Sequence, residues 1–330
     1  MTRWKLFRYR VEDIACRSLG SLIPKLSRGS LLRFAHALGS LAFRFDRRGR
    51  SVALANLECV FGSRFTEAER AEIARRSYQN FVLTMLSLFW ATRLTPHNFR
   101  EWIIPEGFDA LRERLTSSKR GAVFMCIHQG NWEWASLVCG FLGFGNVVVA
   151  ENFKNPRLTD TFKRLREHSG QTLIGQEKSL LRLLRVAKRA GATGMLIDLN
   201  LRPDQPATAM ETFGPGGLLM CVPLLHALLA ERAGALLVPV ETQPLEDGRC
   251  RVIAHPPVEL PEAATIPDIC QRCWSEMEPI IHARPHEYLW AYKHFRYRPK
   301  NAQRPYPAYS NESGKFEKLL RGKAAGRDAR

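Results

Sequence analysis

The sequence predicts an α/β protein whose mostly parallel sheet is flanked by helices, because strand-like and helix-like segments alternate along the chain from Gly121. The clearest strand is the apolar run 122–127, which follows a glycine and contains β-branched and aromatic residues. A helix follows it directly, since Asn131 can cap a helical end and apolar residues recur as far as Phe141. Further strands are expected at 147–150, 173–174, 194–199 and 235–241, with an edge strand at 251–254. Helices are expected within 152–170 and at 178–189, 223–232 and 266–281.

The first 100 residues predict a helical region in front of the α/β domain, which we place at 101–300. Segment 30–45 carries apolar residues at helical spacing together with Arg33, His36 and Arg44. This pattern fits two structures equally: a membrane-attaching helix that lies in the interface with its basic residues at headgroup depth, or a helix packed on the protein's own core. The remaining tail, 301–330, is polar and basic, and we expect its final 17 residues to be disordered.

The charge of the chain is concentrated at its two ends. The whole chain has 49 Lys and Arg against 32 Asp and Glu, a formal net charge of +17. Residues 1–50 hold 12 basic and 3 acidic residues, and residues 293–330 hold 11 and 3, so the ends contribute +9 and +8. Basic ends on a neutral body indicate contact with anionic phospholipid, nucleic acid or an acidic protein, or else solvated tails that have no partner.

The cysteines and the amino end indicate where the protein works. The eight cysteines lack the spacing of a small disulfide framework, so we expect reduced thiols in a protein that faces the cytosol. Cys270 and Cys273 have no second pair to complete a zinc site, so no metal site is expected. We expect no cleavable signal peptide, because Glu12 and Asp13 follow the first basic residues, and no spanning helix, because no apolar run reaches about 18 residues.

His128 and Glu133 are the candidate catalytic residues. His128 lies in the turn between a strand's carboxyl end and a helix's amino end, where open α/β sheets bind ligands. Glu133 follows in the first helical turn, close enough to fold back toward the imidazole, and a histidine with a carboxylate partner is suited to act as a general base. Gly130 lets a backbone or a substrate approach closely. The alternative is a buried, hydrogen-bonded histidine beside a helix whose first turn carries an acidic residue.

The residues around this pair resemble a known family. His-Gln-Gly-Asn-Trp-Glu at 128–133 resembles the His-x4-Asp/Glu motif of the lysophospholipid acyltransferase superfamily, and Gly-Asn-Trp-Glu looks like its bacterial lipid A (lauroyl/myristoyl) acyltransferase branch. Arg166, in Arg-x-x-x-Gly, matches an arginine of the family, and Asp198 matches the Asp of its Asp-Gln motif. The resemblance covers about residues 45–300 in consistent order. Leu199 stands where the family has Gln, and the stretch after Phe213 lacks the usual Thr or Ser, which bears on the acceptor more than on the chemistry.

The resemblance implies a lysophospholipid acyltransferase-like fold and a defined reaction. A fatty acyl group would move from an acyl-carrier-protein thioester to a hydroxyl of a glycolipid, a lipid A precursor. His128 would take the proton from that hydroxyl while Glu133 orients the imidazolium, and the acceptor oxygen would attack the thioester directly. The residues expected to bind substrate are Gly130, Asn131, Arg166 and Asp198. No metal or bound cofactor is implied, and the protein would be peripheral or monotopic on the cytoplasmic face of a bacterial inner membrane.

Two other readings remain open. The donor could be acyl-coenzyme A, or the acceptor another glycolipid or a lysophospholipid, with the same mechanism. A protein of a different class, a non-catalytic lipid- or nucleic-acid-binding protein with basic arms, has no need for His128 and Glu133 together. We expect no nucleic-acid partner, because no zinc-finger, RNP-type or helix-turn-helix motif is present.

Overall fold

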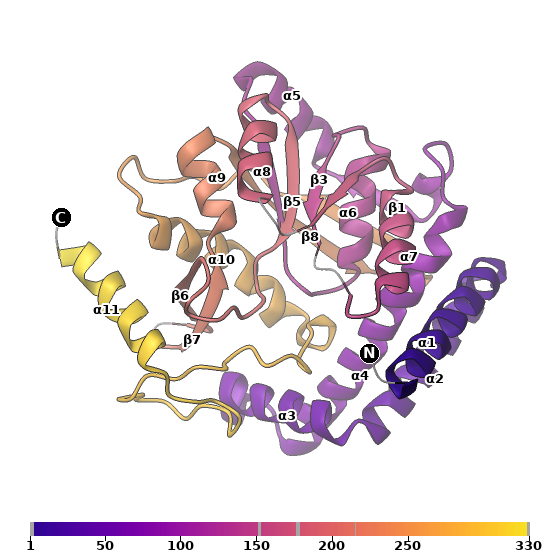
Figure 1. Ribbon diagram of the computed structural model, residues 1–330, viewed down its shortest axis with the longest axis horizontal. Coiled ribbons are helices and arrows are strands. Elements are labelled where there is room, and N and C mark those ends of the chain that lie inside the picture. The colour runs from indigo at the N-terminus through magenta and orange to yellow at the C-terminus, as the bar shows by residue number, and fades with distance from the viewer. Residues whose placement is uncertain (1–2, 151–152, 176–178, 215, 329–330) are drawn as a thin grey trace.

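The computed structural model describes residues 3–150, 153–175, 179–214 and 216–328. Two expected helical segments begin at Asn152 and Lys178, which lie outside these ranges. A seven-stranded sheet has the order β1-β9-β8-β2-β5-β3-β4 (Figure 1). Its strands are β1 (Ile103–Glu106), β2 (Ala122–Cys126), β3 (Val147–Val149), β4 (Thr172–Ile174), β5 (Ala192–Leu196), β8 (Leu236–Pro244) and β9 (Cys250–Ala254). The α/β fold class with a mostly parallel sheet is confirmed.

Two parts of the β structure differ from the prediction. β9 is antiparallel to β8 but is covered by β1, so the edge strand is Ile103–Glu106 and not 251–254. β1 contains Pro105 and only four residues, too short for its period-2 pattern to be recognised. A separate antiparallel pair, β6 (Ala207–Thr212) and β7 (Leu218–Pro223), was also missed, because both strands lie in a Gly- and Pro-interrupted stretch.

Helices cover both faces of the large sheet, and alternate residues of each strand point to opposite faces. Val123 and Met125 of β2 pack into a core with helices of one face, whereas Ala122 and Phe124 pack into a core with helices of the other. The helices of the α/β part are α5 (Phe108–Ser118), α6 (Trp132–Phe141), α7 (Pro156–Glu167), α8 (Ser179–Lys188), α9 (Leu225–Ala233) and α10 (Ile266–Ala283). The three layers bury β2 on both sides, as its continuous apolar sequence predicts.

Four helices precede the sheet: α1 (Arg3–Leu22), α2 (Arg28–Phe45), α3 (Arg47–Phe61) and α4 (Glu67–Trp90). Thr66 and Glu69 form a capping box at the start of α4. α2 packs closely on α4, since a Cβ at Gly39 would lie 2.5 Å from the Cα of Gln79. Buried Arg28 donates to the Gly248 carbonyl at 2.7 Å and lies over the Trp134 ring at 4.5 Å, so it ties α2 to the sheet and to α6.

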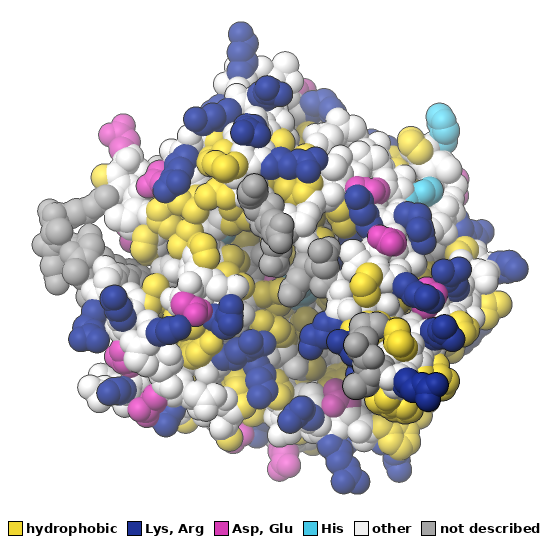
Figure 2. Space-filling view, in the orientation of Figure 1, with side chains coloured by type: hydrophobic (Ala, Val, Ile, Leu, Met, Phe, Trp, Pro, Cys, Tyr) yellow, Lys and Arg dark blue, Asp and Glu magenta, His cyan; other side chains and the backbone are white. Residues whose placement is uncertain are grey.

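The structure shows one of the two arrangements expected for segment 30–45, a helix packed on the protein's own core. Leu31 and Ala35 are fully buried, so one face packs on the protein. The opposite face leaves Phe34, Leu38, Leu41 and Phe45 exposed, and α1 exposes a similar stripe of Trp4, Phe7, Val11 and Ile14. Figure 2 shows hydrophobic side chains interspersed with Lys and Arg over the ends of these two helices. Within the described ranges, no helix combines the length and the apolar character needed to cross a bilayer.

Of the final 17 residues, for which we expected disorder, the structure describes 314–328 and has a helix there. Residues Gly314–Asp328 form α11, and its Phe316 is fully buried beside Ala209 and Cys221 of the β6–β7 pair. Phe316, Leu319 and Leu320 supply an apolar face that the composition of the tail as a whole concealed.

Candidate active site

The candidate active site lies in the turn that joins β2 to α6. Asn131 is the N-cap of α6, and its side chain accepts a hydrogen bond from the Trp134 backbone N–H at 3.3 Å, as predicted. His128 and Glu133 are 8% and 4% exposed. The turn follows the last residue of β2, so it lies at the carboxyl edge of the parallel strands. Its polar side chains lie inside the molecule.

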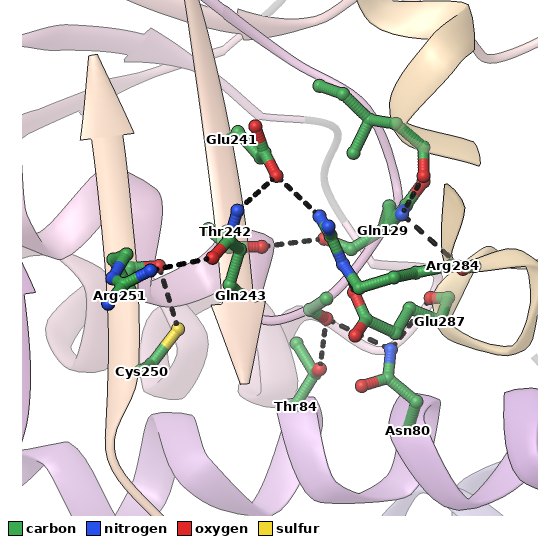
Figure 3. A network of polar contacts seen from close by, with 12 residues as sticks. Asn80, Thr84, Gln129, Glu241, Thr242, Gln243, Cys250, Arg251, Arg284 and Glu287 are labelled. Atoms are coloured by element: carbon green, nitrogen blue, oxygen red, sulfur yellow. Dashed lines mark hydrogen bonds and ion pairs between the residues drawn. The ribbon is translucent and has the colours of Figure 1, made fainter. Parts of the chain in front are cut away.

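Neighbouring elements hold this turn by its backbone. Asn80 and Thr84 of α4 donate to the Gly130 carbonyl at 3.0 and 2.9 Å, and Thr242 of β8 donates to the Gln129 carbonyl at 2.9 Å (Figure 3). On the other side, the Leu289 N–H donates to the His128 carbonyl at 3.0 Å. Three segments far apart in sequence thus fix the position of His128.

Gly130 is required by the fold at this point. Its φ is +58°, and a Cβ would lie 2.3 Å from Thr242 Oγ1 and 2.7 Å from the Thr242 carbonyl oxygen. The close approach that its lack of a side chain permits is made by the backbone of β8. Gly130 therefore shapes the turn, and the structure places no open space for substrate at its Cα.

His128 is paired with Asp198. Its Nδ1 lies 2.8 Å from Asp198 Oδ1, and its backbone N–H donates to Asp198 Oδ2 at 3.0 Å. Burial would raise the pKa of the Asp198 carboxyl, but the charge and hydrogen bonds of His128 outweigh it, and the pKa is lowered. An ionised Asp198 accepts a hydrogen bond from Nδ1–H, which leaves Nε2 as the basic nitrogen of the ring. The described residues give Nε2 no hydrogen-bond partner.

This pairing differs from the expectation that Glu133 orients the imidazole. The Glu133 carboxylate instead accepts two hydrogen bonds from Arg166, from Nε at 2.9 Å and from Nη2 at 2.6 Å. The physical reason is sheet topology: β5 lies beside β2, the Ile197 N–H donates to the Cys126 carbonyl, and Asp198 arrives next to His128. A carboxylate 70 residues away in the chain thus takes the place that the short spacing assigned to Glu133.

Arg166 joins the Glu133 pair to a cavity of about 330 Å³. The Arg166 side chain is 21% exposed, whereas the Glu133 side chain is 5% exposed. Burial would lower the pKa of Arg166, but the charge and hydrogen bonds of Glu133 raise it, so it stays positively charged. The cavity has an apolar wall beside this cation, and its lining includes Phe153, Phe162, Lys163, Leu173 and Ile174. Such a lining can take an anionic or polarised group together with an apolar chain.

The structure thus brings all six predicted site residues to one end of the sheet. His128, Gly130, Asn131 and Glu133 share the β2–α6 turn, Asp198 bonds to His128, and Arg166 bonds to Glu133. Of the four expected substrate-binding residues, Arg166 lines the cavity. Asp198 is 0% exposed and Asn131 is 3% exposed, and both are bonded within the protein.

Several residues that support the site gave no usable sequence signal. Tyr288 and His294 lie fully buried near Asp198, whose charge adds to burial in raising the pKa of Tyr288. Asn56 of α3 donates to the carbonyls of Trp290 and Tyr292, both at 2.8 Å, and so fixes the segment that contains them. Asn56 and this segment are more than 230 positions apart in the sequence, and only the fold shows that they meet.

The side chains near the turn bear on whether a thiol could act as a nucleophile, and those of the rest of the described chain on whether a metal ion could be held. Burial raises the pKa of both cysteine thiols near the turn, Cys126 and Cys139, so neither is poised as a thiolate nucleophile. Throughout the part of the chain that the structure describes, no group of three His, Cys, Asp or Glu side chains is placed to hold a metal ion.

Comparison with known proteins gives the same family as the residues around the turn. The sequence model of the family described as bacterial lipid A biosynthesis acyltransferase matches residues 11–297. A lipid A biosynthesis lauroyltransferase from Escherichia coli (strain K12) is 24% identical over 303 residues, which cover 86% of this chain and 91% of the relative. The resemblance drawn from the sequence is confirmed.

Proposed function

Because the chain belongs to the bacterial lipid A biosynthesis acyltransferase family, and is therefore an acyltransferase, we propose that it moves a fatty acyl group from an acyl-carrier-protein thioester to a hydroxyl of a lipid A precursor. The observation that carries the mechanism is the buried His128–Asp198 pair at the carboxyl edge of the parallel strands. A base with a fixed tautomer is what transfer to a hydroxyl requires.

In the proposed reaction, His128 Nε2 removes the proton from the acceptor hydroxyl as the oxygen attacks the thioester carbonyl carbon. The carbon–oxygen bond forms, the carbon–sulfur bond breaks, and the imidazolium returns its proton to the departing thiolate. Asp198 stabilises the imidazolium through Nδ1 and keeps the ring in place, which is a positioning role. The protein supplies no covalent intermediate, in keeping with the raised thiol pKa values of Cys126 and Cys139.

We assign Glu133 and Arg166 to the substrate side of this reaction. Glu133 holds Arg166 through Nε and Nη2, so Nη1 is left without a partner among the described residues and can face the cavity. A guanidinium in that position can bind a phosphate of the acceptor or stabilise negative charge on the thioester oxygen. Glu133 remains in the catalytic machinery, acting through Arg166 and not through His128. The apolar wall of Phe153, Phe162, Leu173 and Ile174 would take part of an acyl chain.

We further propose that the exposed stripes of α1 and α2 attach the protein to the cytoplasmic face of the inner membrane. Four large apolar side chains on each helix recur every three or four residues, with basic residues between them. Such helices lie in the interface with their apolar side chains below the headgroups and their cations among anionic lipids. Replacing Phe34, Leu38 and Leu41 with Ser should move the protein from the floating vesicle fraction to the bottom fraction in a flotation assay with anionic vesicles. Equal flotation of this variant would contradict the proposal.

The function is tested by measuring acyl transfer from acyl-carrier-protein and coenzyme A thioesters to a lipid A precursor and to lysophospholipids. Transfer from the carrier-protein thioester to the lipid A precursor, lost in His128→Gln at an unchanged melting temperature, is the expected result. Transfer from coenzyme A alone, or to a lysophospholipid alone, would keep the acyltransferase and replace the donor or the acceptor. Activity that survives in His128→Gln would overturn the mechanism.

A further inference from the structure

The cations of α7 and α8 differ in whether the protein itself neutralises them. Three of the four cations of α7 have carboxylate partners: Arg157 with Asp13 at 3.3 Å, Lys163 with Glu167 at 4.0 Å, and Arg166 with Glu133 at 2.6 Å. The fourth, Arg164, donates to the Thr161 hydroxyl at 3.3 Å. α8 carries Arg182, Arg185 and Lys188, contains no acidic residue, and is followed by Arg189. These four side chains are exposed, and the described residues provide none of them with an ion pair or a hydrogen bond.

The exposed face of α8 is apolar as well as basic. Leu181 is 58% exposed, and Leu180 and Leu184 are partly exposed beside the arginines. α8 packs on α9, where Leu225 and Leu228 are also partly exposed. Figure 2 shows Lys and Arg side chains gathered around hydrophobic ones over these two helices. A surface that combines apolar side chains with unpaired positive charge is suited to an acidic protein partner, which supplies complementary carboxylates around an apolar contact.

The position of α8 connects this surface to the site. Gly175 lines the cavity beside Arg166, and α8 begins four residues later at Ser179. α8 lies away from α1 and α2 in the molecule (Figure 1). A donor protein that binds at α8 would therefore reach the cavity without crossing the face that we assign to the membrane.

We propose that the basic face of α8, Arg182, Arg185, Lys188 and Arg189 around Leu181, is the docking surface for the acidic carrier protein that bears the acyl thioester. This inference rests on the proposed function, in which the donor is an acyl-carrier-protein thioester. The surface binds the carrier by charge complementarity around an apolar contact, and the acyl group passes over Gly175 into the cavity at Arg166. The cations act on donor binding and take no part in the chemical step.

The test compares two triple variants of the full chain. The first is Arg182→Gln, Arg185→Gln and Lys188→Gln, and the matched control is Arg47→Gln, Lys318→Gln and Arg321→Gln, three exposed cations on α3 and α11. KM and kcat are measured with acyl-carrier-protein and with a small acyl thioester such as acyl-pantetheine. Three exposed charges at an interface are worth about a tenfold change in affinity in total.

The α8 variant should raise KM for acyl-carrier-protein about tenfold, with kcat and transfer from the small thioester unchanged, while the control variant behaves as the wild type. The dependence of KM on salt should also be weaker in the α8 variant, because fewer charges remain to be screened. An unchanged KM would overturn the docking surface and leave the proposed function intact. If the wild type uses the small thioester and coenzyme A but not the carrier protein, acyl-carrier-protein is not the donor. That result would overturn both the proposed donor and the docking surface. Binding of the α8 face to anionic vesicles, without an effect on carrier KM, would assign it to lipid and also overturn the proposal.

Discussion

Two acid–base pairs lie at the amino end of α6, and the protein holds them in different ways. Asp198 is fully buried and uses both carboxylate oxygens on His128, one on the ring and one on the backbone. Glu133 uses both oxygens on the Arg166 side chain alone, and that side chain is 21% exposed and lines a cavity. The first pair is fixed inside the protein, and the second reaches the space where substrate would lie.

The difference between the His128–Asp198 and Glu133–Arg166 pairs suggests a separate task for each. In the His128–Asp198 pair both partners are held by the fold, so the pair can fix the tautomer of the imidazole and hold its basic nitrogen in position. In the Glu133–Arg166 pair the arginine keeps an unused N–H edge, so the pair can respond to charge on a substrate. In the structure the His-x4-Glu spacing thus spans two separate hydrogen-bonded pairs, and we propose that each pair has its own task.

The largest expected effect comes from removing the base. His128→Gln should lower kcat by about 10³-fold, within the range typical of general-base removal, with the melting temperature nearly unchanged. The matched control is His97→Gln, at an exposed histidine far from the turn in sequence, which should keep full activity. A His128→Gln enzyme with a tenth or more of the wild-type rate would show that another group takes the proton.

Asp198→Asn removes the negative charge from the His128–Asp198 pair while keeping the shape of the side chain. The amide can no longer stabilise an imidazolium and can hold the wrong tautomer, so we expect kcat to fall by about 10²-fold or more. Because the pKa of Asp198 is lowered in the folded protein, the wild type also gains stability from it above its unfolded pKa near 4 and loses that stability as the pH falls further. Turnover at neutral pH measures the fall in kcat, with circular dichroism to show that the variant is folded. An acid titration followed by circular dichroism measures the loss of stability. Unchanged turnover in Asp198→Asn would contradict the pairing.

The second pair is tested by a double-mutant cycle with Glu133→Gln, Arg166→Gln and the double variant. Breaking a buried ion pair by removing one partner leaves the other charge uncompensated, so each single change should lower activity about tenfold or more. The double variant should be less impaired than the product of the single effects, with a coupling of about 1–3 kcal/mol. Independent, multiplicative losses would mean that the 2.6 and 2.9 Å contacts do not operate in the working enzyme.

Gly130 tests the frame that the two pairs share. Gly130→Ala places a methyl against Thr242 and imposes φ of +58° on a residue with a Cβ, so it should destabilise the fold by about 3 kcal/mol. Gly314→Ala is the control, because a Cβ there meets nothing within 4 Å. Denaturant unfolding measures both variants. Equal stability would show that the turn has room which the structure does not give it.

The smallest effect concerns Glu287, whose backbone carbonyl accepts a hydrogen bond from the Gly130 N–H (Figure 3). Burial raises the pKa of Glu287 to about 7 despite its ion pair with Arg284. A carboxyl with a raised pKa binds more protons folded than unfolded, so the free energy of unfolding should fall by on the order of 2 kcal/mol as the pH rises from about 4.5 to 7. Glu287→Gln should flatten this dependence. An identical pH profile for variant and wild type would contradict the assignment.

Much of the fold could be read from the sequence because its signals are local. The apolar run 122–127 and the cap at Asn131 correctly predicted β2 and α6, and alternation after Gly121 predicted the parallel strands. The missed strand β1 is short and contains Pro105, and β6 and β7 flank the Gly- and Pro-rich stretch 213–217. The burial of Phe316 was hidden because composition was read over the whole tail and not along one helical face.

The site residues could be named but not paired. His128, Glu133, Arg166 and Asp198 each lay in a recognisable motif, yet pairing is set by which strands are neighbours in the sheet. β2 and β5 pair although the partners Ala122 and Ala192 are 70 positions apart, and this brings Asp198 to His128. The nearer carboxylate in sequence was therefore assigned to the wrong partner.

The central claim is that Asp198, and not Glu133, holds the imidazole of His128. The most direct measurement is the nitrogen-15 NMR spectrum of the His128 ring in the wild type, Asp198→Asn and Glu133→Gln, with melting temperatures recorded alongside. Asp198 accepts the hydrogen bond of Nδ1 at 2.8 Å, so the Nδ1–H signal should shift or disappear in Asp198→Asn and stay in place in Glu133→Gln. A signal that changes in Glu133→Gln and not in Asp198→Asn would contradict the account.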